Sequence, residues 1–279
     1  MQKGQIALGV FAVILVAALY FGGKTATKKE KSVVHTEHGG ISFDEYEQQQ
    51  IAKLADAEKQ QAKSLAEATK NAPEQTIDAK KKAYANLVDF WKNNSNPALA
   101  AYYIYQAAIL EETKTALVDA GDALVTAYKS TEDSVILNNL ITFALQSYEK
   151  AVEKDSNDLD LKIKLADAYV NGSQEPMKGI GILRDLESKH PENIKVLMSM
   201  SRMSIQSGQY DKAKERLNKI LKLEPQNTEA MYFLAITEAQ LGHNDEAIRL
   251  FEMCKILVNN ADFNKEIDEI VNSLKNKKI

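Results

Sequence analysis

The sequence predicts an all-α protein in which most helices form a solenoid of helix–turn–helix units. The first observation is a repeat: the segment 193–225 is followed, 34 residues later, by a similar segment at 227–257. A fixed period of this length is typical of helical solenoids. The second is composition, because Gly (12) and Pro (5) are scarce among 279 residues, which favours helix over strand. The third is an uncharged stretch near the N-terminus that stands apart from the repeat.

The two repeated segments match at positions where paired helices must approach closely. The matched pairs are Leu197 with Met231, Met200 with Leu234, Ser201 with Ala235, Gly208 with Gly242, Ala213 with Ala247, and Leu217 with Phe251. Two helices approach to about 8–9 Å only where the contact residues are small. Both glycines fall in the turn within a unit, where a positive φ is easily adopted.

Residues 4–23 predict a single transmembrane helix behind a short N-tail at 1–3. The stretch contains 20 uncharged residues, and at about 1.5 Å per residue it spans roughly 30 Å, the hydrocarbon thickness of a bilayer. A cleaved signal peptide is the alternative, with a small-residue site at Val16-Ala17-Ala18. An uncleaved anchor in the cell (inner) membrane of a bacterium is the preferred interpretation. The positive-inside rule places the C-terminal part in the cytoplasm, whereas a short N-tail suits a signal anchor facing outward, so the side stays open.

A linker and a spacer helix are expected next. Residues 24–41 lack periodicity and end in Gly39-Gly40, as a flexible tether does. His35 and His38 form an H-x-x-H pair, but no further ligand lies nearby to complete a metal site. Ser42 and Glu45 form a capping box that begins a helix over about 43–71, in a solvated spacer region at 42–72. Its apolar heptad breaks, so dimerisation through it is the less favoured alternative.

Four further helices are predicted between 73 and 158, a region of degenerate repeats. They cover about 75–93, 97–113, 115–129 and 134–154, and Asn96-Pro97 begins the second of them. The second helix contains Tyr102, Tyr103 and Tyr105. We interpret it as buried between neighbours, with an aromatic ligand-stacking site as the alternative.

The pattern over 159–258 resembles the tetratricopeptide repeat family, in which small residues stand where two antiparallel helices cross. Ala235, Ala247 and Cys254 take the small positions of the last unit, and Leu165-Ala166 with Tyr169 match the first helix of the earliest unit. That unit has one extra residue, expected in the turn 171–176. The segment 259–279, with an apolar stripe over 262–275, resembles the capping helix that ends such arrays.

This resemblance implies a concave groove lined by the first helix of each unit. Carried over position by position, the lining is Ile163, Asp167, Val170, Lys195, Met198, Arg202, Ile205, Gln206, Tyr232, Ile236 and Gln240. Apolar side chains among isolated charges suit an extended peptide or a helix of a partner protein.

No catalytic chemistry is expected of this chain. Nucleophile elbows, P-loops, dinucleotide fingerprints and H-E-x-x-H sites are missing from the sequence, so no catalytic, cofactor-binding or metal-binding residue is assigned. Cys254 falls on a packing position and is expected to be buried. A net charge of −4 argues against nucleic-acid binding.

The sequence therefore predicts a membrane-tethered scaffold or adaptor that binds a protein or peptide in its groove, in envelope protein export, folding or complex assembly. Its contact with the lipid bilayer would be through residues 4–23. The alternative is a structural envelope component that forms homo-oligomers through the spacer and transmembrane helices.

Overall fold

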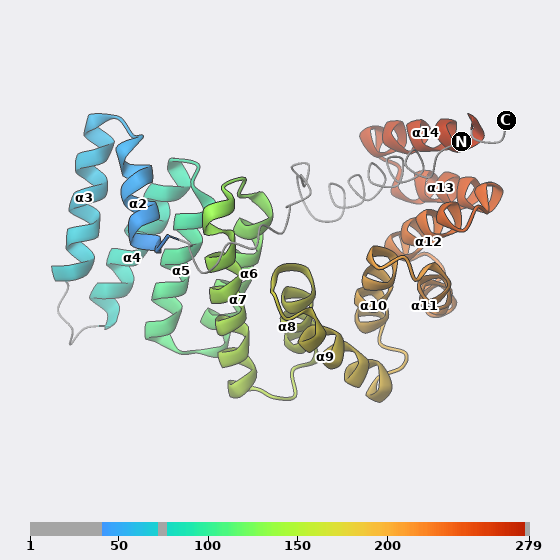
Figure 1. Cartoon of the computed structure of the whole chain (residues 1–279), viewed down its shortest axis with the longest axis horizontal. Coiled ribbons are helices and arrows are strands. Elements are labelled where there is room, and N and C mark those ends of the chain that lie inside the picture. The colour runs from blue at the N-terminus through green and yellow to red at the C-terminus, as the bar shows by residue number, and fades with distance from the viewer. Residues whose placement is uncertain (1–40, 72–76, 277–279) are drawn as a thin grey trace. The chain divides into compact units, whose positions relative to one another are not determined.

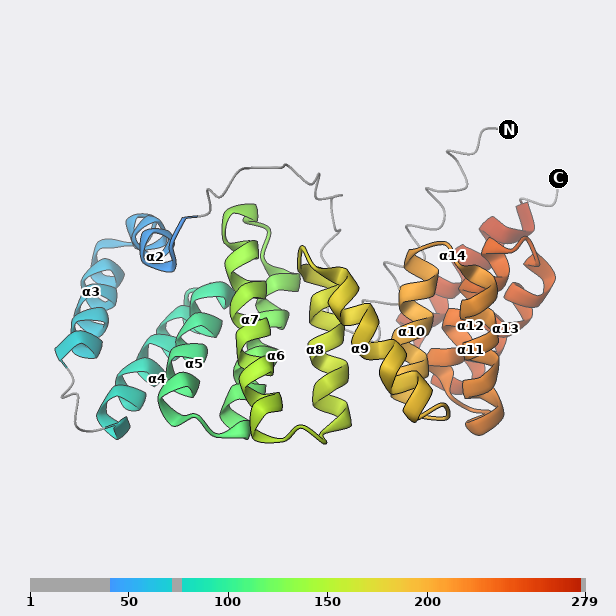
Figure 2. The same ribbon diagram turned by 60° about the horizontal axis from the view of Figure 1, so that its bottom comes forward.

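The computed structural model describes residues 41–71 and 77–276, and every regular element in these residues is an α-helix. Figures 1 and 2 show the helices from two directions. The helices are α2 (Phe43–Ala52), α3 (Asp56–Asn71), α4 (Ile77–Asn93), α5 (Pro97–Glu111), α6 (Lys114–Ser130), α7 (Ser134–Lys154), α8 (Leu159–Gly172), α9 (Pro176–Lys189), α10 (Ile194–Gln206), α11 (Tyr210–Leu223), α12 (Thr228–Gln240), α13 (Asn244–Val258) and α14 (Ala261–Asn276). The predicted all-α solenoid of helix pairs is confirmed.

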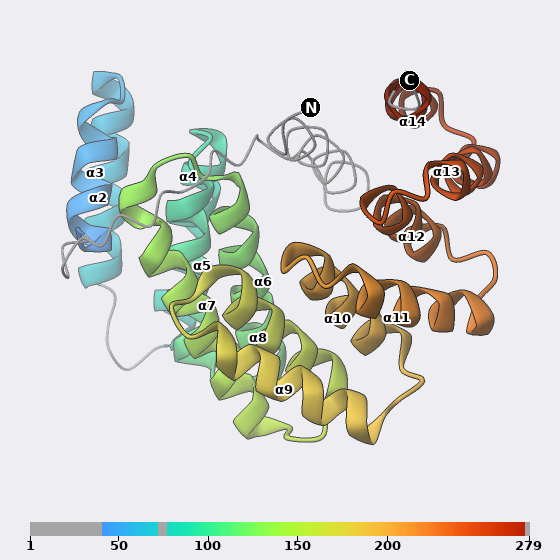
Figure 3. The ribbon, with the colours of Figure 1, turned by 45° about the vertical axis from the view of Figure 1, so that its right-hand side comes forward.

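The described residues form two compact units, and the division falls within α9. The N-terminal unit contains residues 41–182, and the C-terminal unit contains residues 183–276. In the N-terminal unit α4 packs on α5, α5 on α6, α6 on α7 and α7 on α8. In the C-terminal unit α10 packs on α11, α11 on α12, α12 on α13 and α13 on α14. Figure 3 shows α12, α13 and α14 one after another.

The first helix of each of the last three pairs begins with the same cap. Side-chain oxygens of Asp158, Asn193 and Asn227 accept hydrogen bonds from backbone amides three residues later, at 3.0, 3.1 and 2.9 Å. Such caps satisfy amides that have no partner within the helix. The first two caps are 35 residues apart and the last two are 34 apart, and the extra residue lengthens α8 to 14 residues against 13 for α10 and α12.

The turns within the last two pairs depend on glycine, as the sequence predicts. Gly208 has a φ of 72° and Gly242 a φ of 83°, a region that side chains rarely adopt. The apolar stripe of α14 is buried on the C-terminal unit through Phe263, Ile267, Val271 and Leu274.

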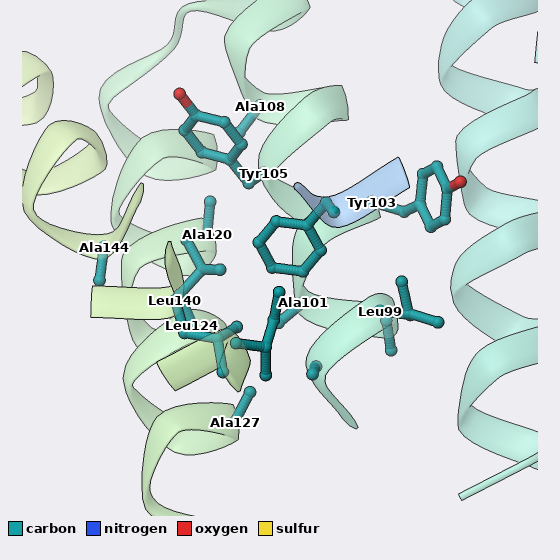
Figure 4. Packing of buried hydrophobic residues seen from close by; sticks show 14 of the residues in the cluster. Leu99, Ala101, Tyr103, Tyr105, Ala108, Ala120, Leu124, Ala127, Leu140 and Ala144 are labelled. Atoms are coloured by element: carbon teal, nitrogen blue, oxygen red, sulfur yellow. The ribbon is translucent and has the colours of Figure 1, made fainter. Parts of the chain in front are cut away.

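The core of the N-terminal unit combines leucines with alanines at the helix crossings. Leu99, Leu124 and Leu140 are fully buried, and Ala120 and Ala144 are 0% exposed, so the helices can approach closely (Figure 4). One side of α4 is buried in this core through Leu87, Phe90 and Trp91.

The single helix predicted over 43–71 is wrong, because α2 ends at Ala52 and α3 begins at Asp56. The capping box of α2 is present, with Ser42 N–H donating to Glu45 at 2.8 Å and Glu45 N–H donating to Ser42 at 3.2 Å. Glu58 accepts from the amide of Ala55 at 3.2 Å and so gives α3 an N-terminal contact of its own. Moreover, α2 buries one side on the N-terminal unit, which a solvated spacer would not do.

The predicted anchor at 4–23 and the histidine pair at 35 and 38 lie outside the described residues. Among residues 41–71 and 77–276, no helix is both long enough and apolar enough to cross a bilayer.

Candidate functional site

The predicted groove residues lie on the first helices of three consecutive pairs. Helix α8 belongs to the N-terminal unit, whereas α10 and α12 belong to the C-terminal unit and contact each other. The lining of α10 and α12 therefore forms one surface, called the α10–α12 surface, and the lining of α8 belongs to the other unit.

The apolar members of the predicted lining are buried, except Val170 on α8, which is half-buried. Met198, Ile205, Tyr232 and Ile236 are all at most 5% exposed and belong to the hydrophobic core of the C-terminal unit. The ring of Tyr232 lies 5.6 Å from that of Phe251 on α13 and 6.1 Å from that of Phe263 on α14. Ile163 on α8 is buried too, at 7% exposure. In this structure the predicted apolar anchors pack inside the protein and are not offered to a partner.

The polar members of the lining reach solvent. Lys195 and Gln206 on α10 are exposed, and Gln240 on α12 and Asp167 on α8 are half-buried. Arg202 forms an ion pair with Glu229, which joins α10 to α12, and its guanidinium carbon lies 5.7 Å from the centre of the Phe233 ring. A guanidinium over an aromatic face is attracted to it. The surface that α10 and α12 present is therefore polar and charged, with one aromatic ring.

A buried carboxylate on α12 is a feature that sequence reasoning missed. Glu238 is 3% exposed, and its oxygens lie 2.9 Å from Lys214 Nζ and 2.6 Å from His243 Nδ1. Lys214 comes from α11, and His243 stands at the turn before α13. Buried charges need paired partners. This cluster therefore ties α12 to its neighbours.

A surface pocket of the C-terminal unit lies between α9, α10 and α11. Its lining includes Glu187, Pro191, Leu197 and Arg216. The Arg216 guanidinium donates to both carboxylate oxygens of Glu187, at 2.6 and 3.1 Å, and to Ser204 at 3.2 Å. Because these acceptors already occupy the guanidinium, it is not available as an anion site.

Chemistry-bearing groups are few in the described part of the chain. Cys254 is fully buried, as predicted, and burial raises the pKa of its thiol to about 12, so the thiolate is scarce at neutral pH. No group of three or more His, Cys, Asp or Glu side chains that could hold a metal ion occurs in residues 41–71 and 77–276.

The tyrosines of α5 are in contact with other aromatic side chains. Tyr102 stacks on Phe43 of α2 with centroids 4.2 Å apart, and Tyr105 stacks on Phe143 of α7 at 4.7 Å. Tyr103 and Tyr105 are buried, which agrees with the predicted burial of this helix. In this conformation Tyr102 and Tyr105 stack on Phe43 and Phe143, so these protein rings take the place that an aromatic ligand would have in a stacking site.

Part of this region of helix pairs matches a known family model. Residues 204–254 match a model of the tetratricopeptide repeat family. The match covers the end of α10, all of α11 and α12, and most of α13. No curated protein matches the sequence.

Several solved structures are similar to the chain at low identity. TTC0263, a thermophilic TPR protein in Thermus thermophilus, is 18% identical, with 68% of this chain and 98% of that chain covered and a TM-score of 0.49. MamA from Desulfovibrio magneticus is 16% identical, with 65% and 97% covered and a TM-score of 0.46. YrrB, described as a TPR protein with an unusual peptide-binding site, is 15% identical, with 74% and 96% covered and a TM-score of 0.42. At these scores the likenesses carry no conclusion about partners or location.

Proposed function

We propose that this protein is a scaffold that binds a partner protein or peptide on the first helices of its repeats and that residues 4–23 hold it at a membrane. The observation that carries the proposal is the α10–α12 surface, where solvent-reaching polar groups stand on a fully packed core. In solenoids of helix pairs, such surfaces bind other proteins.

The α10–α12 surface favours a partner with charged and hydrogen-bonding groups. Lys195 and Gln206 are exposed polar side chains, and the Arg202–Glu229 pair brings both signs of charge into one contact. The apolar anchors expected from the sequence would be reached only after a rearrangement of the core. An extended peptide held by polar contacts therefore fits this surface better than a helix inserted by its apolar side.

Photo-crosslinking in intact cells tests where the partner binds. A photoreactive amino acid at Gln206 or Gln240 should give a discrete crosslinked product, because both positions are on first helices. The same amino acid at exposed Lys212 or Glu215 of α11 serves as the matched control. The combined change Lys195→Glu and Arg202→Glu should abolish the product, whereas Arg249→Glu on α13 should not. Products of equal yield from first and second helices would contradict the proposal.

The membrane part of the proposal rests on the uncharged stretch at 4–23 alone. A chain with these residues deleted should leave the membrane fraction, whereas the intact chain should stay there after alkaline carbonate extraction. Recovery of both chains in the same fraction would refute the anchor. Protease protection in intact and permeabilised cells then decides between cytoplasm and periplasm.

A self-associating structural component is the second candidate, and one surface of α13 favours it. Met253, Ile256 and Leu257 are spaced i, i+3 and i+4 and are 36%, 77% and 40% exposed. An apolar stripe of this kind on a solvent-exposed surface is typical of a contact with another protein. Light scattering of residues 41–279 at tens of micromolar should show an oligomer that Ile256→Glu dissociates. A monomer at this concentration excludes assembly through the stripe.

A further inference from the structure

Helix α2 is bound to the N-terminal unit as a separate short helix. It has 10 residues, and three non-helical residues, 53–55, separate it from α3. Its buried side consists of Phe43, Tyr46, Glu47 and Ile51, spaced i, i+3, i+4 and i+8. Amphipathic helices that bind in grooves of other proteins use this arrangement of anchors. A helix of this length is marginal in water by itself, so docking maintains α2.

The surface beneath α2 is built by α4, α5 and α7. The ring of Phe43 stacks on Tyr102 of α5, with centroids 4.2 Å apart and planes within 6°, and lies 5.6 Å from Phe143 of α7. Asn139 of α7 donates from Nδ2 to the backbone carbonyl of Ile41 at 2.8 Å, which fixes the direction in which the helix enters.

A buried carboxylate gives this surface its specificity. Glu47 is 6% exposed, and its Oε1 accepts from Trp91 Nε1 of α4 at 3.1 Å and from Tyr103 hydroxyl of α5 at 2.8 Å. Without α2, both donors would lack this acceptor. The site therefore selects a helix with an aromatic residue at one position and an acceptor four residues later. An apolar residue at the acceptor position would leave two buried donors without partners.

The same carboxylate limits how tightly α2 can dock. Glu47 loses water on docking, and the structure gives it neutral donors rather than a salt-bridged cation. Burial of a charge without a counter-charge is costly. Hence aromatic stacking stabilises the docking of α2, whereas the burial of Glu47 opposes it.

We propose that α4, α5 and α7 form a helix-binding site that α2 occupies in the free protein, and that a partner protein enters it with a helix of the same chemistry. The partner helix has an aromatic residue in the place of Phe43, a second aromatic residue in the place of Tyr46 and a carboxylate in the place of Glu47, at positions i, i+3 and i+4. This site lies within the N-terminal unit and is independent of the α10–α12 surface.

A synthetic peptide with the sequence of residues 41–53 tests the proposal against the full chain. In the wild-type chain α2 competes at an effective concentration on the order of 1 mM, so the peptide should bind weakly. The full chain with Phe43→Ala keeps every residue of the site and weakens its own α2 on the order of 100-fold. It should therefore bind the peptide at least ~10-fold more tightly than wild type does. Gln48→Ala, on the exposed side of α2, is the matched control and should behave as wild type.

Changes in the peptide test the predicted selectivity with the Phe43→Ala chain. A peptide with Phe43→Ala or Glu47→Leu should bind at least ~10-fold more weakly, whereas Glu47→Gln should retain binding because its carbonyl oxygen still accepts from Trp91 and Tyr103. Equal affinity for the Leu and Gln peptides would overturn the assigned role of the two donors.

A second chain keeps the test decisive if Phe43→Ala impairs folding. Insertion of about 20 Gly and Ser residues after Lys53 preserves all contacts of α2 and lowers its effective concentration, so the peptide should bind several-fold more tightly than to wild type. The proposal is overturned if the peptide binds neither the Phe43→Ala chain nor the insertion chain more tightly than it binds the wild-type chain. A dimer of the wild-type chain that Phe43→Ala dissociates would show exchange of α2 between two copies, and would overturn the assignment to a separate partner.

Discussion

The crossing of α6 and α7 permits a quantitative test of the close packing that the repeat pattern predicts. A Cβ atom added at Gly121 of α6 would lie 2.4 Å from Cε1, 2.7 Å from Cδ1 and 2.8 Å from Cζ of Tyr148 on α7. The ring cannot move away freely, because its hydroxyl donates to Asp122 at 2.6 Å and Asp122 is also paired with Lys164 of α8. Gly121→Ala should therefore strain the crossing.

The expected loss follows from two opposing contributions. Alanine in place of glycine within a helix gains up to about 1 kcal/mol, and overpacking of a tight core costs about 1–3 kcal/mol. Gly181 on α9 provides the matched control, because a Cβ there meets no atom within 4 Å. Gly181→Ala should show the gain alone. The free energies of unfolding of the two variants should thus differ by about 1–3 kcal/mol, which is the cost of the clash.

The single tryptophan makes the assay specific to the unit that is changed. Trp91 is 1% exposed and lies in the N-terminal unit with both glycines, so its fluorescence in urea follows the unfolding of that unit. The midpoints at equal slope give the difference in stability. In a Tyr148→Leu background, which removes the clashing ring atoms, the penalty of Gly121→Ala should shrink. A Gly121→Ala chain as stable as Gly181→Ala would refute this account of the crossing.

Three further predictions concern single groups. The Cys254 thiol, whose pKa burial raises to about 12, should resist a thiol reagent at pH 8 in the folded chain and react promptly in urea. Burial raises the pKa of Glu47 in the folded chain. The contribution of Glu47 to the free energy of unfolding should therefore fall as the pH rises from its pKa in the unfolded chain to its pKa in the folded chain. Unfolding followed by Trp91 fluorescence should show that Glu47→Gln removes this pH dependence. Gly242→Ala, at a φ of 83°, should lower the melting temperature, with a loss of about 1 kcal/mol, and Gly242→Asn should lose less.

The repeat region could be predicted closely because its helices follow local rules. The 34-residue period, the glycine turns and the small residues at crossings each act within one helix pair, so sequence spacing alone shows them. The boundaries of α7 (Ser134–Lys154) agree with the predicted range for the same reason. The division within α9 has no such local signal, since it depends on which contacts form between units.

The break after α2 was missed because the prediction rested on helix-forming composition. Residues 43–71 are rich in Gln, Lys, Glu and Ala, which favour helix at every position, and nothing in the sequence of 53–55 forbids it. Tertiary contacts decide the break: Phe43 must meet Tyr102, and Glu47 must meet Trp91 and Tyr103. The signal available was the aromatic content of the first turn, because Phe43 and Tyr46 share one side of a helix that was expected to be solvated.

The burial of the predicted apolar anchors could have been read from the residues of α12. Residues 230–236 are seven consecutive apolar side chains, so no side of this stretch carries the polar groups that a solvent-facing surface needs. The family resemblance implies that Tyr232 and Ile236 lie on a surface, whereas this apolar run predicts that they are buried. Helix α10 differs, because Lys195, Arg202 and Gln206 are spaced 7 and 4 residues apart and therefore share one side of the helix. Hence α10 supplies the solvent-facing stripe of the α10–α12 surface, and α12 contributes mainly Glu229, through its pair with Arg202.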